Sequence, residues 1–159
     1  MGIALVGGVV AFGASTREAD ARQSCRKIHG TITSHITDPA NCTSPVGLCT
    51  AGTITGGGPL NGATVFTTLA LAPSACLPGV PPTTLSYTGV LTISTRRGTV
   101  TTTDVGLLDQ ANLVFTEIDT VQGGTGEFAG ATGTWLISGP VIDNGTGFRG
   151  DITGELCVP

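Results

Sequence analysis

Apolar and polar residues alternate with a period of two along most of the chain, as in strands that bury one face. In the segment 84–94, Leu85, Tyr87 and Leu91 share one face, while Ser and Thr residues share the other. No stretch shows the spacing of an amphipathic helix. The pattern predicts eight strands, at 27–36, 49–56, 62–72, 84–94, 97–107, 112–121, 127–138 and 147–157.

The number and length of these strands favour a closed sheet. Strands of about ten residues suit a barrel better than a small sandwich, and about eight strands enclose room for side chains or one small ligand. Arg96-Arg97-Gly98 has the character of a hairpin turn between two long strands. We therefore predict an all-β, eight-stranded antiparallel up-and-down barrel, formed as a single domain by residues 22–159.

Residues 1–21 have the pattern of an export signal. An apolar run at 3–14 precedes Ala19-Asp20-Ala21, an A-x-A cleavage pattern. The run is shorter than the ~20 residues that span a bilayer, so we expect no stable membrane span. The positive charge usual near the start of a signal peptide is missing. We favour a signal peptide, and hence a secreted, extracellular protein, over a retained apolar N-terminal segment.

The chain carries unusually little charge. Charged residues make up 11% of the sequence, compared with about 25% in an ordinary soluble domain. Residues 39–95 carry no charged side chain at all. The formal net charge of −4 gives no electrostatic reason to bind nucleic acid.

Five cysteines in a short chain with an export pattern indicate disulfides. Cys25 precedes the first predicted strand and Cys157 ends the last, and a closed barrel makes those strands neighbours, so we expect Cys25 to pair with Cys157. Cys42 and Cys49 either close a small loop, or one of them pairs with Cys76, and one thiol is left over. The cysteine spacings do not resemble zinc knuckles, so we expect no metal and no cofactor.

One segment resembles a known family. Residues 115–136, Phe-Thr-Glu-Ile-Asp-Thr-Val-Gln-Gly-Gly-Thr-Gly-Glu-Phe-Ala-Gly-Ala-Thr-Gly-Thr-Trp-Leu, place an acidic strand before a glycine turn and a small-residue strand. This arrangement resembles the late-barrel segment of the allene oxide cyclase and dirigent proteins, here as a secreted, bacterial-type member. The resemblance covers about a fifth of the chain and depends on the turn together with Phe128, Ala131 and Gly133.

The resemblance implies an eight-stranded barrel with a hydrophobic lumen, assembled as a dimer or trimer. It also implies a function by steric templating, in which a flexible substrate is held in one conformer for ring closure or coupling. The acidic and proline positions near the start of the plant cyclases have no counterpart in residues 25–40, so no catalytic residue is carried over.

Glu117 and Asp119 are the candidate catalytic residues. Two positions apart on a strand, they share a face at a distance of ~7 Å. On an apolar inner face their pKa values would rise and they could polarise a ligand. Their separation also suits inverting glycosidases. Both faces of this strand are mixed, and we favour the alternative in which the acids face outward and Ile118 faces inward.

Aromatic residues supply the ligand-binding candidates. Phe115 shares the face of the two acids, and Tyr87 and Trp135 are candidates for stacking on a ligand. For Tyr87 and Trp135, packing in the barrel core is the alternative that we favour.

The leading hypothesis for function is a secreted barrel that binds a small apolar molecule in its lumen. If the protein is an enzyme, we expect a cyclase or isomerase that acts by templating. The alternative is a non-enzymatic extracellular structural or assembly protein, such as a filament or surface subunit, in which the N-terminal apolar segment pairs with a neighbour. A homo-oligomer fits both, and a glycan-active protein is a weaker third hypothesis.

Overall fold

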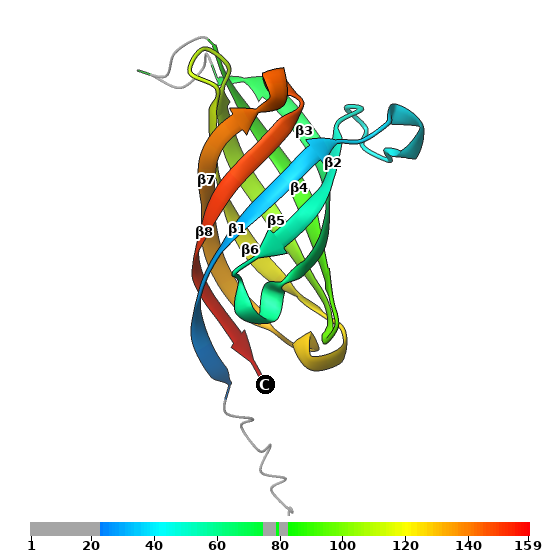
Figure 1. The fold of residues 1–159 in the computed structure, drawn as a ribbon, viewed down its shortest axis with the longest axis vertical. Coiled ribbons are helices and arrows are strands. Elements are labelled where there is room, and N and C mark those ends of the chain that lie inside the picture. The colour runs from blue at the N-terminus through cyan, green and yellow to red at the C-terminus, as the bar shows by residue number, and fades with distance from the viewer. Residues whose placement is uncertain (1–22, 75–78, 80–82) are drawn as a thin grey trace, which may run out of the picture.

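A computed structural model describes residues 23–74, 79 and 83–159. These residues form one closed, antiparallel barrel in which each strand pairs with its neighbours in sequence and β1 pairs with β8 (Figure 1). The fold class predicted from the alternation is therefore confirmed. The strands are β1 (Ser24–Ile36), β2 (Cys49–Thr55), β3 (Gly62–Pro73), β4 (Thr84–Thr95), β5 (Gly98–Asp109), β6 (Val114–Gly124), β7 (Thr132–Ile142) and β8 (Gly147–Val158).

Short 3-10 turns connect several strands. They are η1 (Pro39–Asn41), η2 (Gly58–Leu60), η4 (Gly126–Phe128) and η5 (Asp143–Gly145). No helix within the described residues is long and apolar enough to cross a membrane. The predicted N-terminal segment 1–21 lies outside the described residues.

The predicted strand 127–138 begins five residues too early. The chain forms η4 first, because Gly126 (φ 61°) and Gly130 (φ 73°) adopt backbone angles that suit a turn. Gly126 also lies so close to the Arg97 carbonyl that an added Cβ would be 2.3 Å from its oxygen. The glycine run therefore folds a turn against the β4–β5 connection, which is an architectural role.

Both termini of the described chain lie at the lower end of the barrel (Figure 1). Apolar side chains pack together in the half of the barrel next to this end. Leu60 of η2 and Phe128 of η4 are fully buried and close this end. Trp135 is buried among them. The other members of this packed layer include Ile28, Ile54, Ile93, Val100, Val121 and Leu156.

Two disulfides are present: Cys25–Cys157, the pair expected from the sequence, and Cys42–Cys49, one of its two alternatives for the remaining cysteines. Cys25 and Cys157 face each other across the β1–β8 pair with their Cα atoms 3.9 Å apart. Cys42 and Cys49 close a short loop before β2. Cys76, the alternative partner, lies outside the described residues.

Candidate functional site

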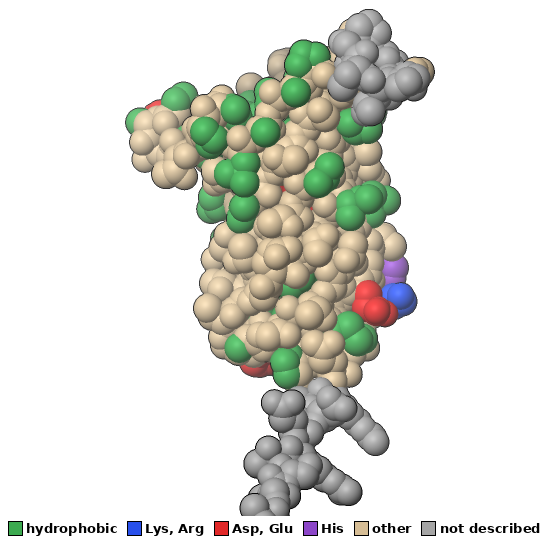
Figure 2. Space-filling view, turned by 180° about the vertical axis from the view of Figure 1, so that it is seen from behind, with side chains coloured by type: hydrophobic (Ala, Val, Ile, Leu, Met, Phe, Trp, Pro, Cys, Tyr) green, Lys and Arg blue, Asp and Glu red, His purple; other side chains and the backbone are tan. Residues whose placement is uncertain are grey.

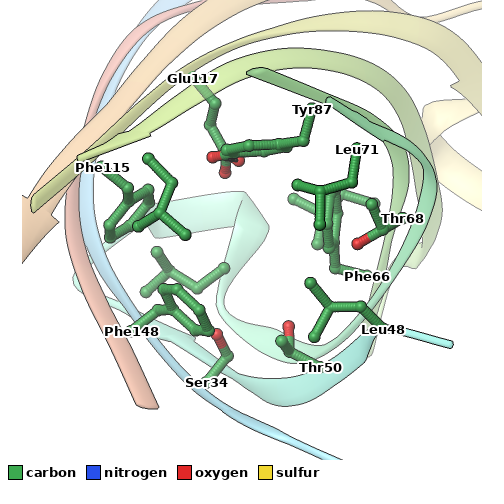
Figure 3. A pocket seen from close by; sticks show the side chains of 13 residues that line it. Ser34, Leu48, Thr50, Phe66, Thr68, Leu71, Tyr87, Phe115, Glu117 and Phe148 are labelled. Carbon is green, nitrogen blue, oxygen red and sulfur yellow. Dashed lines mark hydrogen bonds between the residues drawn. The ribbon is translucent and has the colours of Figure 1, made fainter. Parts of the chain in front are cut away.

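The upper half of the lumen contains a cavity of about 60 Å³. It is small beside the ~300–1,000 Å³ of pockets for drug-sized molecules, so it suits a small molecule or one end of a larger one. Figure 3 shows side chains from β1 to β6 and from β8 pointing into this space. Its lining consists of Ile32, Ser34, Leu48, Thr50, Phe66, Thr68, Leu71, Tyr87, Leu91, Leu108, Phe115, Glu117 and Phe148.

Four aromatic rings form much of this wall, arranged as two edge-to-face pairs. Phe66 and Tyr87 have their ring centroids 6.1 Å apart, and Phe115 and Phe148 have theirs 5.6 Å apart. The two pairs lie on different sides of the cavity (Figure 3). Rings in this geometry present both faces and edges to an occupant.

Tyr87 and Glu117 form a hydrogen-bonded pair in the wall of the cavity, and the small size of Gly106 allows this contact. Gly106 stands between them in the register, opposite Tyr87 on one side and Glu117 on the other. A Cβ on Gly106 would lie 2.3 Å from the Tyr87 ring, so only glycine lets the ring lie across β5. The Tyr87 hydroxyl then donates a hydrogen bond of 2.7 Å to Glu117 Oε2.

The surroundings of Glu117 raise its pKa to near neutral pH. Burial raises the pKa of Glu117 to about 7, and the negative charge of Asp104 acts in the same direction, while the hydrogen bond from Tyr87 opposes them. Burial, followed by the nearby charge of Glu117, raises the pKa of Tyr87, which therefore stays a donor. A carboxyl group with this pKa can accept or release a proton near neutral pH.

Below the cavity, two further carboxyl groups face each other. Asp104 on β5 and Asp119 on β6 are register partners and both are fully buried. The Thr102 hydroxyl lies 2.7 Å from Asp104 Oδ1 and 3.0 Å from Asp119 Oδ1. Since a hydroxyl has only one hydrogen to donate, a proton on one of the two acids lets both contacts be hydrogen bonds.

The electrostatics assign that proton to Asp119. Burial, followed by the hydrogen bond to Asp104, raises the pKa of Asp119 to about 11, and burial also raises the pKa of Asp104. The Oδ2 atoms of both acids are buried, and no donor group among the described residues reaches them. A shared proton therefore satisfies a pair that would otherwise bury two repelling charges.

The favoured orientation of the acidic strand was wrong. Glu117 and Asp119 face the lumen, whereas Ile118, expected inside, is 54% exposed on the outer surface. The two faces of this strand are both mixed and gave no clear contrast, and protonation and hydrogen bonding make the burial of the two acids tolerable. Glu117 lines the cavity and Asp119 does not, so the two do not form the accessible pair that a glycosidase uses.

Two of the three ligand-binding candidates line the cavity, and the third does not. Tyr87 and Phe115 line the cavity, while Trp135 belongs to the packed lower half and is not among the lining residues. Trp135 Nε1 is buried without a hydrogen-bond partner among the described residues.

Asp104 and Gly106 were not singled out from the sequence. The available signal was strand parity, because Asp104 lies on the same face as Val100 and Leu108, both of which turn inward. Parity marks a residue as inward only after the face is known, and the Thr-rich β5 offered no clear contrast between its faces.

The charged side chains of the outer wall gather on β1 and β8, where Arg26, Lys27, Arg149 and Asp151 are exposed. Ion pairs lie on β1 and β8 (Lys27–Glu155, with N···O 3.1 Å) and at the lower turns (Arg97–Glu127). Figure 2 shows the opposite side, where charged side chains lie mainly at the edges of the face. Val105, Ile118 and Leu136 form an exposed apolar row across β5, β6 and β7.

One group of potential metal ligands exists in the described part of the chain, formed by Cys25, Glu155 and Cys157. The disulfide uses both sulfurs, so these residues do not offer a thiolate site.

No protein-family model, curated protein or solved structure matches the chain. The resemblance to the allene oxide cyclase and dirigent proteins therefore remains a prediction. Function has to be argued from the lumen itself.

Proposed function

We propose that this protein binds a small, mainly apolar molecule in the upper half of its lumen and holds the polar group of that molecule against Glu117 and Tyr87. The observation that carries this proposal is the cavity, in which Glu117 is the one ionisable carboxyl among the described lining residues, which are otherwise aromatic, aliphatic or hydroxyl-bearing. An apolar chamber with a few convergent polar groups is the usual form of a small-molecule site.

The division of the lumen supports the same proposal. A barrel that served only as a scaffold would gain stability from filling its interior throughout, because empty space forfeits packing contacts. Here the lower half is packed, while the upper half keeps a cavity beside a carboxyl group that is costly to bury. Function at the cavity gives a reason for both features.

If the protein acts on its ligand, we propose templating of a cyclisation or isomerisation. The two edge-to-face aromatic pairs would restrict the conformers of a flexible molecule. Glu117, with its pKa of about 7, would supply or accept a proton at one position of it. Secretion is part of this proposal and fits the two disulfides, which persist in oxidising surroundings.

A cavity-filling substitution tests the binding proposal. Thr68 lines the cavity, and its buried hydroxyl has no partner among the described residues. Thr68→Leu should fill part of the cavity and should weaken the binding of 3-methylbutan-1-ol by about tenfold or more, as measured by calorimetry.

Thr64→Val is the matched control. Thr64 lies on the same face of β3, also has an unpartnered buried hydroxyl, and does not line the cavity. Its replacement should leave binding unchanged. Equal affinity in the wild type and in a folded Thr68→Leu variant would contradict lumen binding.

A second candidate function is assembly with other copies through the outer wall. The exposed row Val105, Ile118 and Leu136 on a nearly uncharged surface favours it. Barrel closure removes the sheet edges that strand addition needs, so the wall is the surface we propose for contact. Sedimentation should show an oligomer that Ile118→Lys dissociates, whereas a monomeric wild type would argue against assembly.

A further inference from the structure

We propose that the molecule held in the lumen is a hydrophobic amine, bound in its protonated form with the nitrogen beside Glu117 and the apolar body among the aromatic rings. This inference rests on the proposed function, because it names the class of molecule that the same cavity binds.

The first argument is the sign of the charges in the lumen. Three carboxyl groups face the interior, Asp104, Asp119 and Glu117, and no Lys, Arg or His lines the cavity in the described part of the chain. Even with one proton on the Asp104–Asp119 pair, the charge that these three carboxyl groups carry is negative. A cation entering the cavity is attracted by this charge, and an anion is repelled.

The second argument is that Glu117 is surrounded by aromatic side chains. Of the six aromatic residues in the described chain, four line this cavity: Phe66, Tyr87, Phe115 and Phe148. The faces of aromatic rings attract cations, most strongly where water is excluded. Aromatic rings beside a carboxylate are the surroundings in which an alkylammonium group replaces its lost hydration with favourable contacts.

The third argument is the hydrogen-bonding capacity left at Glu117. The Tyr87 hydroxyl donates to Oε2, so Oε1 is the oxygen left for a donor in the cavity. Figure 3 shows the carboxyl group beside the Tyr87 ring and turned toward the interior. The hydroxyls of Ser34, Thr50 and Thr68 line the same space and can accept further N–H bonds. A primary ammonium group has three N–H donors to place among these acceptors.

The expected pH dependence follows from the groups around Glu117. Tyr87 faces it from β4, Asp104 from β5 and Asp119 from its own strand, while its register partner on β7 is the apolar Ile137. Glu117 ionises as the pH rises through about 7, and a simple alkylamine stays protonated to about pH 10, as lysine does. The affinity for an amine should therefore rise between about pH 5.5 and pH 8, whereas a ligand that accepts a proton from Glu117 would show the reverse.

The experiment compares three probes of one shape: 3-methylbutylamine, 3-methylbutan-1-ol and 3-methylbutanoate. Calorimetry at about pH 8 with the whole protein should give the order amine, alcohol, carboxylate, with the amine about tenfold tighter than the alcohol. At about pH 5.5 this preference should shrink to about twofold or less.

Glu117→Gln should abolish the preference for the amine while the alcohol still binds. Glu155→Gln, the same change on the outer face of β8, should leave it intact. Equal binding of amine and alcohol at about pH 8, or an amine preference that survives in Glu117→Gln, would overturn this inference but not the proposed function. If none of the three probes binds, the proposed function itself fails.

Discussion

At the scale of single residues, Gly106 makes room for the contact between Tyr87 and Glu117 in the cavity. Its missing side chain lets the Tyr87 ring lie across β5, and the ring in turn holds Glu117 by a hydrogen bond of 2.7 Å. The hydrogen bond between Tyr87 and Glu117 therefore depends on a residue that itself makes no polar contact in the cavity.

Gly106→Ala should displace the Tyr87 ring, because the new Cβ would lie 2.3 Å from it. We expect the variant to lose about 1–3 kcal/mol of stability, the usual cost of overpacking. In a Tyr87→Ala background the same change should cost little, since the clash is gone. Chemical denaturation of the four proteins in this double-mutant cycle measures the coupling, and additive losses would contradict the contact.

Strand parity explains how much of the site could be predicted. Tyr87 and Leu91 were assigned to one face because β4 alternates cleanly. Thr68 and Leu71 are three positions apart, so strict alternation would place them on opposite faces of β3. Both line the cavity, because a bulge between Thr68 and Ala70 inserts one residue into the strand. Asp119 could not be placed either, because the partner that makes its burial tolerable is on another strand.

At the scale of elements, the seam between β1 and β8 closes the barrel. These strands are furthest apart in sequence, and Cys25–Cys157 joins them across 132 positions. The sequence predicted the seam because closure makes the first and last strands neighbours. It could not give the start of β7, since η4 depends on contacts with the Arg97 turn.

Removal of the seam disulfide should cost more than removal of the loop disulfide. Chain-entropy estimates give about 5 kcal/mol for the long loop closed by Cys25–Cys157 and about 2.5 kcal/mol for the short loop closed by Cys42–Cys49. Thermal and denaturant unfolding of the two double-alanine variants tests this order. A greater loss from the Cys42–Cys49 variant would contradict the role of the seam.

At the scale of the whole molecule, the buried acids set how stability depends on pH. Asp119 and Glu117 have folded-state pKa values of about 11 and about 7, above the ~4 of unfolded chains. The folded state therefore binds more protons above about pH 4, and the free energy of unfolding falls as the pH rises. Each group that is protonated only in the folded state contributes about 1.4 kcal/mol per pH unit.

We therefore expect the protein to be more stable at about pH 5 than at about pH 8. Asp119→Asn should flatten this slope and raise stability at the higher pH, because an amide can donate to Asp104 without needing a proton. Denaturant unfolding at several pH values measures both effects. Stability that increases from the lower to the higher pH would contradict the assignment of protons in the lumen.

The most direct test of ligand binding in the upper lumen uses the only tyrosine and the only tryptophan of the chain. Tyr87 lines the cavity and Trp135 lies in the packed half. NMR spectra of protein labelled at both side chains should be recorded during titration with 3-methylbutylamine at about pH 8. We predict saturable shifts of the Tyr87 ring signals while the Trp135 indole signal stays in place. An unmoved Tyr87 at saturating probe concentration would contradict binding in the lumen.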